Sequence, residues 1–310
     1  MENTRTKTTR NSLILLLTAA IWGMAFVSQS KGMDYMHPFT FNGVRSLIGA
    51  ASILVYILIS RKIAGDKAVP LDWKLNVKAG LLCGIFLTIA STLQQFGIKY
   101  TSVGKAGFIT TLYIIFVPMF GIFLKKKVAP VVWAAAVMAA VGMYLLCMTE
   151  SLRLGAGDIM VFLCAIAFAI QIMTVDHYAA RIDGAVVSCI QFTVCGVVCC
   201  IGALIWGQPT FGQLQEGLGA LLYAGVLSCG VGYTLQIVGQ KGLNPTVAAL
   251  IMSLESVIAT ISGWIAYKIG FLTTDQTLTA RQIAGCVIVF AAVILVQLPP
   301  EWFRFGKKNA

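Results

Sequence analysis

Ten long runs of apolar residues, separated by short links, organise the chain. They lie near residues 12–30, 40–60, 76–97, 103–124, 128–148, 157–175, 185–206, 217–238, 246–267 and 279–298. A helix needs about 20 apolar residues to cross a bilayer, because each residue rises about 1.5 Å against a hydrocarbon core about 30 Å thick. The runs are continuous, whereas membrane β-strands alternate apolar and polar residues over about 10 positions. The pattern therefore predicts an all-α integral membrane protein with ten transmembrane helices.

Composition and charge place these helices in a lipid bilayer and orient them. Hydrophobic residues make up 58% of the chain and charged residues 11%. The net charge of +11 would suggest nucleic acid in a soluble protein, but here the distribution of the charges matters more than their sum. Of the 23 Lys and Arg residues, 16 fall on the side of the N-terminus, six fall on the opposite side, and Arg45 lies inside the second run. The positive-inside rule then predicts a multi-pass protein of the plasma (inner) membrane with both termini cytoplasmic, and no nucleic-acid partner.

All nine cysteines lie within predicted spans, without CxxC spacing and without clustered histidines. They are interpreted as small packing residues, and neither a disulfide framework, a metal site nor a cofactor is expected. A basic start followed by an apolar run is also compatible with a cleaved signal peptide. The run continues through Trp22 and Phe26, which favours a first transmembrane helix.

The chain contains an internal repeat. Residues 93–121 align without gaps on residues 235–263, and eight of the 29 positions are identical. Both copies span a helix, a link and the next helix, and the helices that correspond are five apart. Because five is odd, corresponding helices cross the membrane in opposite directions. We therefore expect two inverted five-helix repeats, 12–148 and 157–298, with cytoplasmic tails at 1–11 and 299–310; alternating-access transporters use this architecture, with the substrate site near mid-membrane.

Four segments carry a family resemblance. "AAIWGMAFVSQ" (19–29), "HPFTFNGVRSLIGA" (37–50), "YTSVGKAGFITTLYIIFVPMFGIFL" (100–124) and "LNPTVAALIMSLESVIATISGWI" (243–265) resemble the drug/metabolite transporter superfamily, specifically its EamA-type branch. The resemblance spans essentially 12–298. It implies ten helices in two inverted halves and a role in moving small metabolites, often amino acids or drugs, commonly outward.

Two features depart from that family pattern. The family often has Gly-Glu after the fourth and ninth helices, where this chain reads "LKKK" (124–127) and "YKIGFLTTD" (267–275). Where the second half usually has Glu-Pro, this chain has Glu255-Ser256. These departures leave the subfamily and the substrate open.

Glu255 is the only formally charged residue between Thr246 and Tyr267. A charged side chain at the bilayer centre costs about 2.5–3.5 kcal/mol on insertion scales, so such residues usually face a cavity and mark a solute or proton path. Low dielectric also disfavours the carboxylate anion, which suits proton exchange. The alternative is a structural hydrogen-bond hub between helices. The repeat pairs Glu255 with Tyr113, and pseudo-symmetry predicts that the two face each other across the centre.

Further candidates for the lining of a solute site are amphipathic or flexible side chains in the spans. Arg45 offers a guanidinium fork that suits a carboxylate, with structural pairing or snorkelling as alternatives. Met252 lies three residues before Glu255, on the same predicted helical face, and Ser253 lies two residues before it. The other candidates are Trp22, Gln94, Gln95, Gln171, Gln191 and Gln236, for which interhelical hydrogen bonding is the alternative role.

These features favour a secondary transporter of small organic solutes. The chain lacks a GxxxxGK[ST] phosphate-binding loop, so transport would draw on a gradient, for example of protons. An exporter of metabolites such as amino acids and a multidrug or organic-cation efflux transporter both fit. A membrane-embedded enzyme is disfavoured because no GxSxG or HExxH motif occurs. A passive channel is the remaining class, and a homodimer is an alternative to the monomer.

Overall fold

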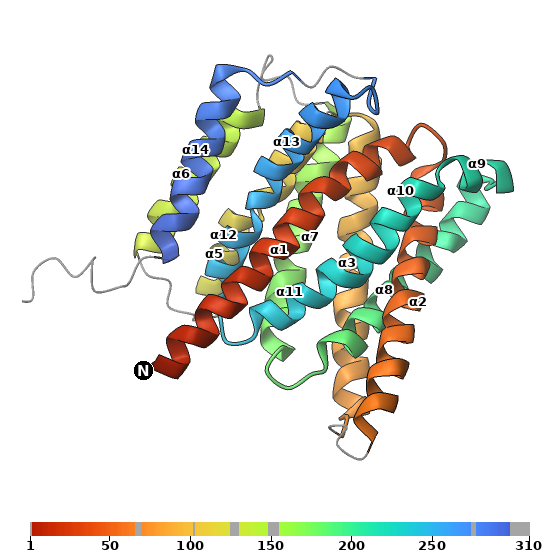
Figure 1. The fold of residues 1–310 in the computed structure, drawn as a ribbon, viewed down its shortest axis with the longest axis horizontal. Helices are drawn as coiled ribbons and strands as arrows, with labels where there is room; N and C mark the ends of the chain where they lie inside the picture. The colour runs from red at the N-terminus through yellow and green to blue at the C-terminus, as the bar shows by residue number, and fades with distance from the viewer. Residues whose placement is uncertain are drawn as a thin grey trace, which may run out of the picture.

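The computed structural model describes residues 2–65, 70–101, 103–124, 130–147, 155–273 and 277–297. In this part of the chain every predicted span is helical (Figure 1). The first five spans are α1 (Glu2–Gly32), α2 (Pro38–Ala64), α3 (Trp73–Lys99), α4 (Val103–Thr111) with α5 (Tyr113–Phe123), and α6 (Pro130–Cys147). The second five are α7 (Ala156–Tyr178), α8 (Gly184–Gly202) with η2 (Ala203–Gly207), α10 (Leu218–Leu222) with η3 (Tyr223–Gly232) and α11 (Tyr233–Gln240), α12 (Pro245–Met252) with α13 (Leu254–Lys268), and α14 (Ala280–Gln297). The short helix α9 (Phe211–Glu216) links two of them.

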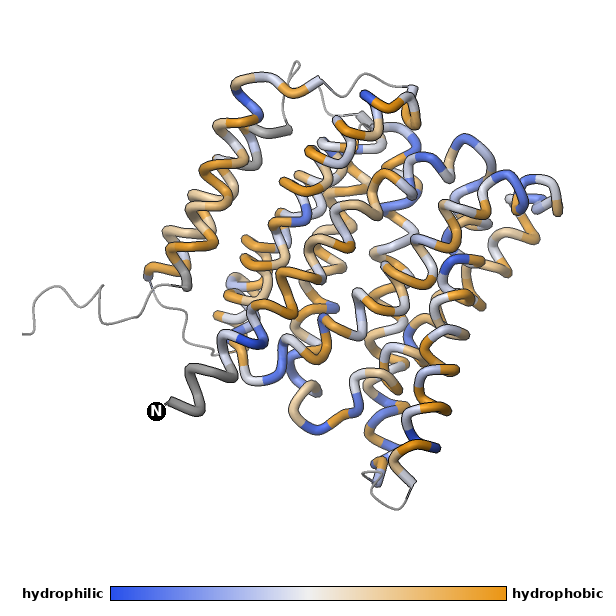
Figure 2. Tube along the Cα trace, in the orientation of Figure 1, coloured by the Kyte–Doolittle hydropathy of each residue, from blue (hydrophilic) through white to orange (hydrophobic). Residues whose placement is uncertain are grey.

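Eight helices of the described chain are long and apolar enough to cross a membrane, and shorter apolar stretches lie at Pro130–Gly142 and Ala280–Leu295. Large aliphatic and aromatic side chains are exposed along the outer faces of these helices. Figure 2 shows apolar residues along the helices and hydrophilic residues gathered towards the links. This distribution suits a lipid environment, in which the helices satisfy their own backbone hydrogen bonds.

Helix starts follow from local capping chemistry. Asp72 accepts a hydrogen bond from Leu75 N at 3.0 Å, and Asp183 accepts from Ala185 N at 2.9 Å. His37 and Asn244 each precede a proline at the first helical position and accept from a backbone N–H two residues on. Such caps satisfy N–H groups that lack an intrahelical partner, and proline there sacrifices no helical hydrogen bond.

The two halves of the chain interlock rather than sit apart. The most extensive helix pairs join one half to the other: α2 with α8, α3 with α7, α6 with α14, and α1 with α13. Where α3 crosses α7, glycine allows the backbones to approach closely, since a Cβ on Gly97 would lie 2.9 Å from Gly157 O. Small residues at such crossings are how membrane helices maximise packing.

The fourth and ninth spans are each interrupted near the middle, although the sequence predicted continuous helices over 103–124 and 246–267. Between α4 and α5, Leu112 N donates to Ile109 O at 3.2 Å, a tighter turn than an α-helix. Between α12 and α13, Ser256 N donates to Ser253 O at 3.1 Å, and Ser253 Oγ donates to Leu250 O at 2.7 Å. Apolar periodicity carries no signal for these turns, because the residues on both sides remain apolar. Each turn precedes a half-helix that starts deep in the membrane.

The second half also contains π-helical stretches where the sequence predicted simple helices, η2 and the ten-residue η3. In η3 the Ser228 carbonyl accepts from Tyr233 N, five residues on, and also from Trp22 Nε1 at 3.4 Å. Stretches of this kind often occur at functional sites.

Candidate functional site

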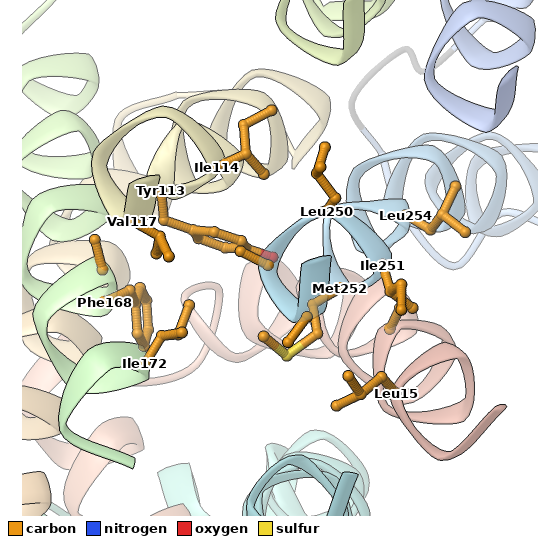
Figure 3. Close-up of a cluster of buried hydrophobic side chains, with 14 of the residues drawn as sticks. Leu15, Tyr113, Ile114, Val117, Phe168, Ile172, Leu250, Ile251, Met252 and Leu254 are labelled. Atoms are coloured by element: carbon orange, nitrogen blue, oxygen red, sulfur yellow. The ribbon is translucent and has the colours of Figure 1, made fainter. Parts of the chain in front are cut away.

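Glu255 and Tyr113 meet at the centre of the bundle. Tyr113 Oη donates to Glu255 Oε1 at 3.1 Å. Both residues are buried: Tyr113 is 2% exposed and Glu255 is 4% exposed. Each lies in the first turn of a half-helix, Tyr113 in α5 and Glu255 in α13. Figure 3 shows Tyr113 extending from α5 towards the junction of α12 and α13, among apolar side chains. The repeat therefore predicted the partner of Glu255 from an alignment alone.

A small cavity surrounds this pair. Its open space is about 30 Å³, and a cavity needs only about 10–15 Å³ on this measure to hold one water molecule. Residues from both halves line it: Trp22, Phe26, Gln29, Arg45, Leu87, Ser91, Gln94, Thr110, Tyr113, Phe168, Gln171, Ile172, Phe192, Ser228, Cys229, Tyr233, Gln236 and Glu255. An organic solute would need these side chains to move apart.

The cavity lining follows the internal repeat. Twelve of the 18 lining residues form six pairs whose members are 142 residues apart. The pairs are Phe26 with Phe168, Gln29 with Gln171, Leu87 with Cys229, Ser91 with Tyr233, Gln94 with Gln236, and Tyr113 with Glu255. The cavity therefore lies on the pseudo-symmetry axis that relates the halves, where inverted-repeat transporters hold their substrates.

Side-chain amides provide most of the neutral polar lining. Gln236 Nε2 donates to Gln171 Oε1 at 3.2 Å, and Gln171 Nε2 donates to Gln191 Oε1 at 3.5 Å. In the first half, Gln94 Nε2 donates to Thr110 Oγ1 at 3.2 Å. The Oε1 atoms of Gln29 and Gln236 are buried without a hydrogen-bond partner. An unpaired buried acceptor is costly, so both atoms offer binding positions for a solute donor or a water molecule.

Arg45 brings a positive charge to the same cavity and is 5% exposed. Its Nε donates to Asn42 Oδ1 at 3.0 Å, and its guanidinium lies 5.5 Å from the ring centre of Phe41. Lys31 pairs with Asp34 and Lys105 with Asp158, whereas Arg45 and Glu255, both within the described residues, form no ion pair with each other. The cavity therefore presents a guanidinium and a carboxyl group as separate polar positions.

Aromatic rings complete the lining. The ring centres of Trp22 and Tyr233 lie 4.5 Å apart, and Phe192 meets Tyr233 edge-on at 4.9 Å. These rings offer apolar faces and, in Trp22 and Tyr233, polar edges.

The structure brings most of the predicted site residues together. Trp22, Arg45, Gln94, Tyr113 and Glu255 line the cavity, as do Gln171 and Gln236. The remaining predicted residues lie outside the lining of this cavity, and they are Gln95, Met252, Ser253 and Gln191.

Each of these outer residues has a local packing or hydrogen-bonding role. Gln95 Nε2 donates to the backbone of Gln29, Ser253 shapes the turn before α13, and Gln191 extends the amide chain from Gln171. Met252 is fully buried in an apolar cluster, as Figure 3 shows.

Sequence reasoning missed several lining residues, notably Gln29, Ser91, Thr110 and Tyr233. The signal for Gln29 was present, because the offset of 142 residues pairs it with Gln171 and pairs Phe26 with Phe168. Extending the repeat to the first and sixth spans would have identified both pairs.

Within the described residues no group of three or more His, Cys, Asp or Glu side chains could hold a metal ion. The cysteines described there are free thiols. Cys195 and Cys199 contact the polar side chains of Asn42, Ser46, Ser91 and Thr92 between α2, α3 and α8.

The chain is similar to known transporters over nearly its whole length. The model of the EamA-like transporter family matches residues 10–148 and again residues 155–298. An uncharacterized transporter from Archaeoglobus fulgidus is 27% identical, over 92% of this chain and 84% of that protein. The uncharacterized transporter YwfM from Bacillus subtilis is 25% identical, over 94% of each. A solved crystal structure shares the fold with a TM-score of 0.73 at 16% identity, covering 96% of this chain and 99% of that chain.

The family match, together with eight apolar helices long enough to cross a membrane in the described chain, defines a multi-pass membrane transporter rather than an enzyme. The chain belongs to the EamA-like transporter family, within the drug/metabolite transporter superfamily. The repeat and the resemblance identified in the sequence are thereby confirmed.

Proposed function

We propose that the protein is a proton-coupled secondary exporter of small organic metabolites that carry an amine and a carboxylate, such as amino acids. The observation that carries this proposal is the buried carboxyl group of Glu255, hydrogen-bonded to Tyr113 on the pseudo-symmetry axis. A group on this axis has an equivalent environment available from either side of the membrane. It can therefore load on one side and release on the other.

Coupling follows from competition for Glu255. In a low-dielectric site a carboxyl group favours its neutral form unless a cation neutralises it. A solute ammonium group supplies that cation, so solute and proton bind alternately. Proton entry would then expel the amine, and an inward proton gradient would drive export.

The carboxylate of the solute would bind Arg45. A guanidinium group presents a planar fork of N–H donors that matches a carboxylate with two parallel hydrogen bonds. In the structure Arg45 donates to Asn42 through Nε, so the two terminal nitrogens of the guanidinium are suited to bind a ligand. Export, rather than import, rests on the family's common direction.

An organic-cation efflux transporter is the second candidate, favoured by the aromatic lining of Trp22, Phe192 and Tyr233. Rings of this kind stabilise cations through their π faces. A ligand that binds the native state but not the unfolded state raises the melting temperature, so a thermal-shift screen separates the two candidates. Stabilisation by amino acids but not by their decarboxylated amines supports the first, and the reverse result supports the second.

Glu255→Gln tests the coupling directly. The amide preserves shape and hydrogen bonding but exchanges no proton, so we expect normal insertion, retained solute-for-solute exchange and loss of gradient-driven accumulation in proteoliposomes. Tyr113→Phe is the matched control, because it removes the hydroxyl donor and keeps the carboxyl group. Unchanged proton-driven accumulation by Glu255→Gln would refute the coupling role.

A further inference from the structure

The four cavity glutamines are related by the repeat but differ in their hydrogen bonds. Gln29 and Gln94 belong to α1 and α3, and their counterparts 142 residues on are Gln171 and Gln236, in α7 and α11. In the second half the counterparts are bonded to each other, Gln236 Nε2 to Gln171 Oε1 at 3.2 Å.

In the first half the equivalent hydrogen bond, from Gln94 Nε2 to Gln29 Oε1, is not formed. Gln94 Nε2 donates instead to Thr110, and Gln29 Oε1 is buried without a partner. The repeat therefore holds one pair closed and one pair open in the same conformation.

The two ends of the bundle also differ from each other, in how tightly their helices pack. At the end that contains Lys241, a cavity of about 650 Å³ opens between α2, α3, α8 and α11, and its lining includes Ser60, Asp183, Ala185, Thr234 and Val238.

At the opposite end, which contains Lys99, the equivalent helix positions carry packed rings. Asp183 and His37 are the N-caps of α8 and α2, and Ala185 and Phe39 are the second residues of those helices. Val238 corresponds to Phe96 across the 142-residue offset. Phe96 lies 5.5 Å from His37 and 5.0 Å from Phe39 between ring centres.

Charge closes the same end. Lys105 Nζ lies 2.6 Å from Asp158 Oδ2, which joins α4 of the first half to α7 of the second. Thr101 Oγ1 also donates to Asp158, at 2.8 Å. The Lys241 end thus carries a large groove, beside which Asp183 N donates to Asn76 Oδ1, whereas the Lys99 end carries packed rings and an ion pair.

Inverted repeats imply a second conformation in which the halves exchange their local arrangements. Given the transport function proposed above, on which this step rests, we infer that the two glutamine pairs form an alternating switch. In the described state Gln171 and Gln236 are closed on each other, and Gln29 offers its free amide oxygen to an N–H or O–H donor of the solute. In the opposite state Gln94 donates to Gln29, and Gln171 and Gln236 receive the solute.

The switch gives each state a solute contact from the half whose pair is open. It also assigns a ligand to the unpaired amide oxygen of Gln29, whereas the unpaired oxygen of Gln236 belongs to the closed pair and is not accounted for by the switch. Proteins usually avoid the cost of such an unpaired buried group. Gln236 has no equivalent of the Gln94–Thr110 bond, because the counterpart of Thr110 is Met252. Gln236→Met therefore removes a bond of the described state, whereas Gln29→Met removes a bond of the opposite state.

The test uses two reporter cysteines at repeat-related positions, Thr92→Cys and Thr234→Cys, introduced singly after the nine native cysteines are replaced. Thr234 lines the cavity at the Lys241 end, and Thr92 lies seven residues before Lys99 in α3, with its Oγ1 3.4 Å from Cys199 Sγ. The ratio of their reaction rates with a water-soluble maleimide, measured in detergent without solute, reports the balance between the two states.

We expect Gln236→Met to raise the reactivity of Thr92→Cys relative to Thr234→Cys about fivefold, the effect of losing one neutral hydrogen bond. Gln29→Met shifts the ratio in the opposite direction. If the Gln236→Met protein folds poorly, Gln171→Met replaces it, because it removes the same hydrogen bond and should shift the ratio in the same direction. Shifts of the same sign in Gln236→Met and Gln29→Met, or no shift in either, overturn the switch.

The result is independent of which solute is carried. A protein that fails to transport any amine but shows the opposed shifts refutes the proposed function and leaves the two conformations standing. A protein that transports but shows no opposed shifts retains its function without the switch.

Discussion

At the scale of single residues, Asn42 determines how Arg45 is presented. Asn42 Oδ1 accepts from Arg45 Nε, while Asn42 Nδ2 donates to Ser91 Oγ at 3.1 Å and to Cys199 Sγ at 3.2 Å. The amide is thus held by α3 and α8 and holds the guanidinium in turn. Arg45 is 5% exposed, so its head does not snorkel to a membrane surface in this conformation. Its position fits a group that binds a ligand in the cavity.

Arg45→Lys tests this role, since lysine keeps the charge but loses the fork and the bond to Asn42. We expect the affinity for an amino acid to fall by about 1.5–3 kcal/mol, the range for a hydrogen bond to a charged group. The decarboxylated amine is the control ligand and should bind equally to both proteins in a calorimetric titration. A lower melting temperature with unchanged affinities would make Arg45 a structural residue.

At the scale of helices, the α3–α7 crossing depends on two glycines. A Cβ on Gly97 would meet Gly157 O at 2.9 Å and also the side chain of Val161. Backbone atoms cannot yield as a flexible side chain can, so the helices would have to separate. Because these helices carry Gln94 and Gln171, their separation would also widen the cavity.

Gly97→Ala should therefore destabilise the protein by about 1–3 kcal/mol, the usual range for overpacking. Gly104→Ala is the matched control, because the nearest atom to its added Cβ would be Thr260 Oγ1 at 3.7 Å. Thermal unfolding in one detergent would compare the two. Equal melting temperatures would show that the crossing accommodates the methyl group.

The sequence was sufficient to predict the helices but not their interruptions. Apolar length located every span, and the 142-residue repeat brought Tyr113 to Glu255. The turns at Leu112 and Ser253 escaped prediction because neither residue is a strong helix breaker. Met252 and Ser253 were expected in the site as neighbours of Glu255, but the turn directs Ser253 Oγ to Leu250 O instead. Contacts between distant helices, such as the hydrogen bond from Asn42 of α2 to Ser91 of α3, are tertiary and leave no local pattern.

At the scale of the whole molecule, the orientation in the membrane remains a prediction from charge. The Lys241 end gathers the N-terminal helix and the start of α3, since Asn11 Nδ2 donates to Lys241 O and Asp183 N donates to Asn76 Oδ1. This is the end that the excess of Lys and Arg places in the cytoplasm. The 650 Å³ cavity would then face the cytoplasm.

Labelling in intact cells decides this orientation. On a cysteine-free background, Asp34→Cys at the Lys99 end should react with an impermeant thiol reagent, because its link would face outward, and Lys74→Cys at the Lys241 end should not. Both positions are exposed in the structure, so burial does not confound the comparison. Lysing the cells supplies the control, because both cysteines should then react. Labelling of Lys74→Cys alone in intact cells would show the opposite orientation, with the Lys241 end and its 650 Å³ cavity outside.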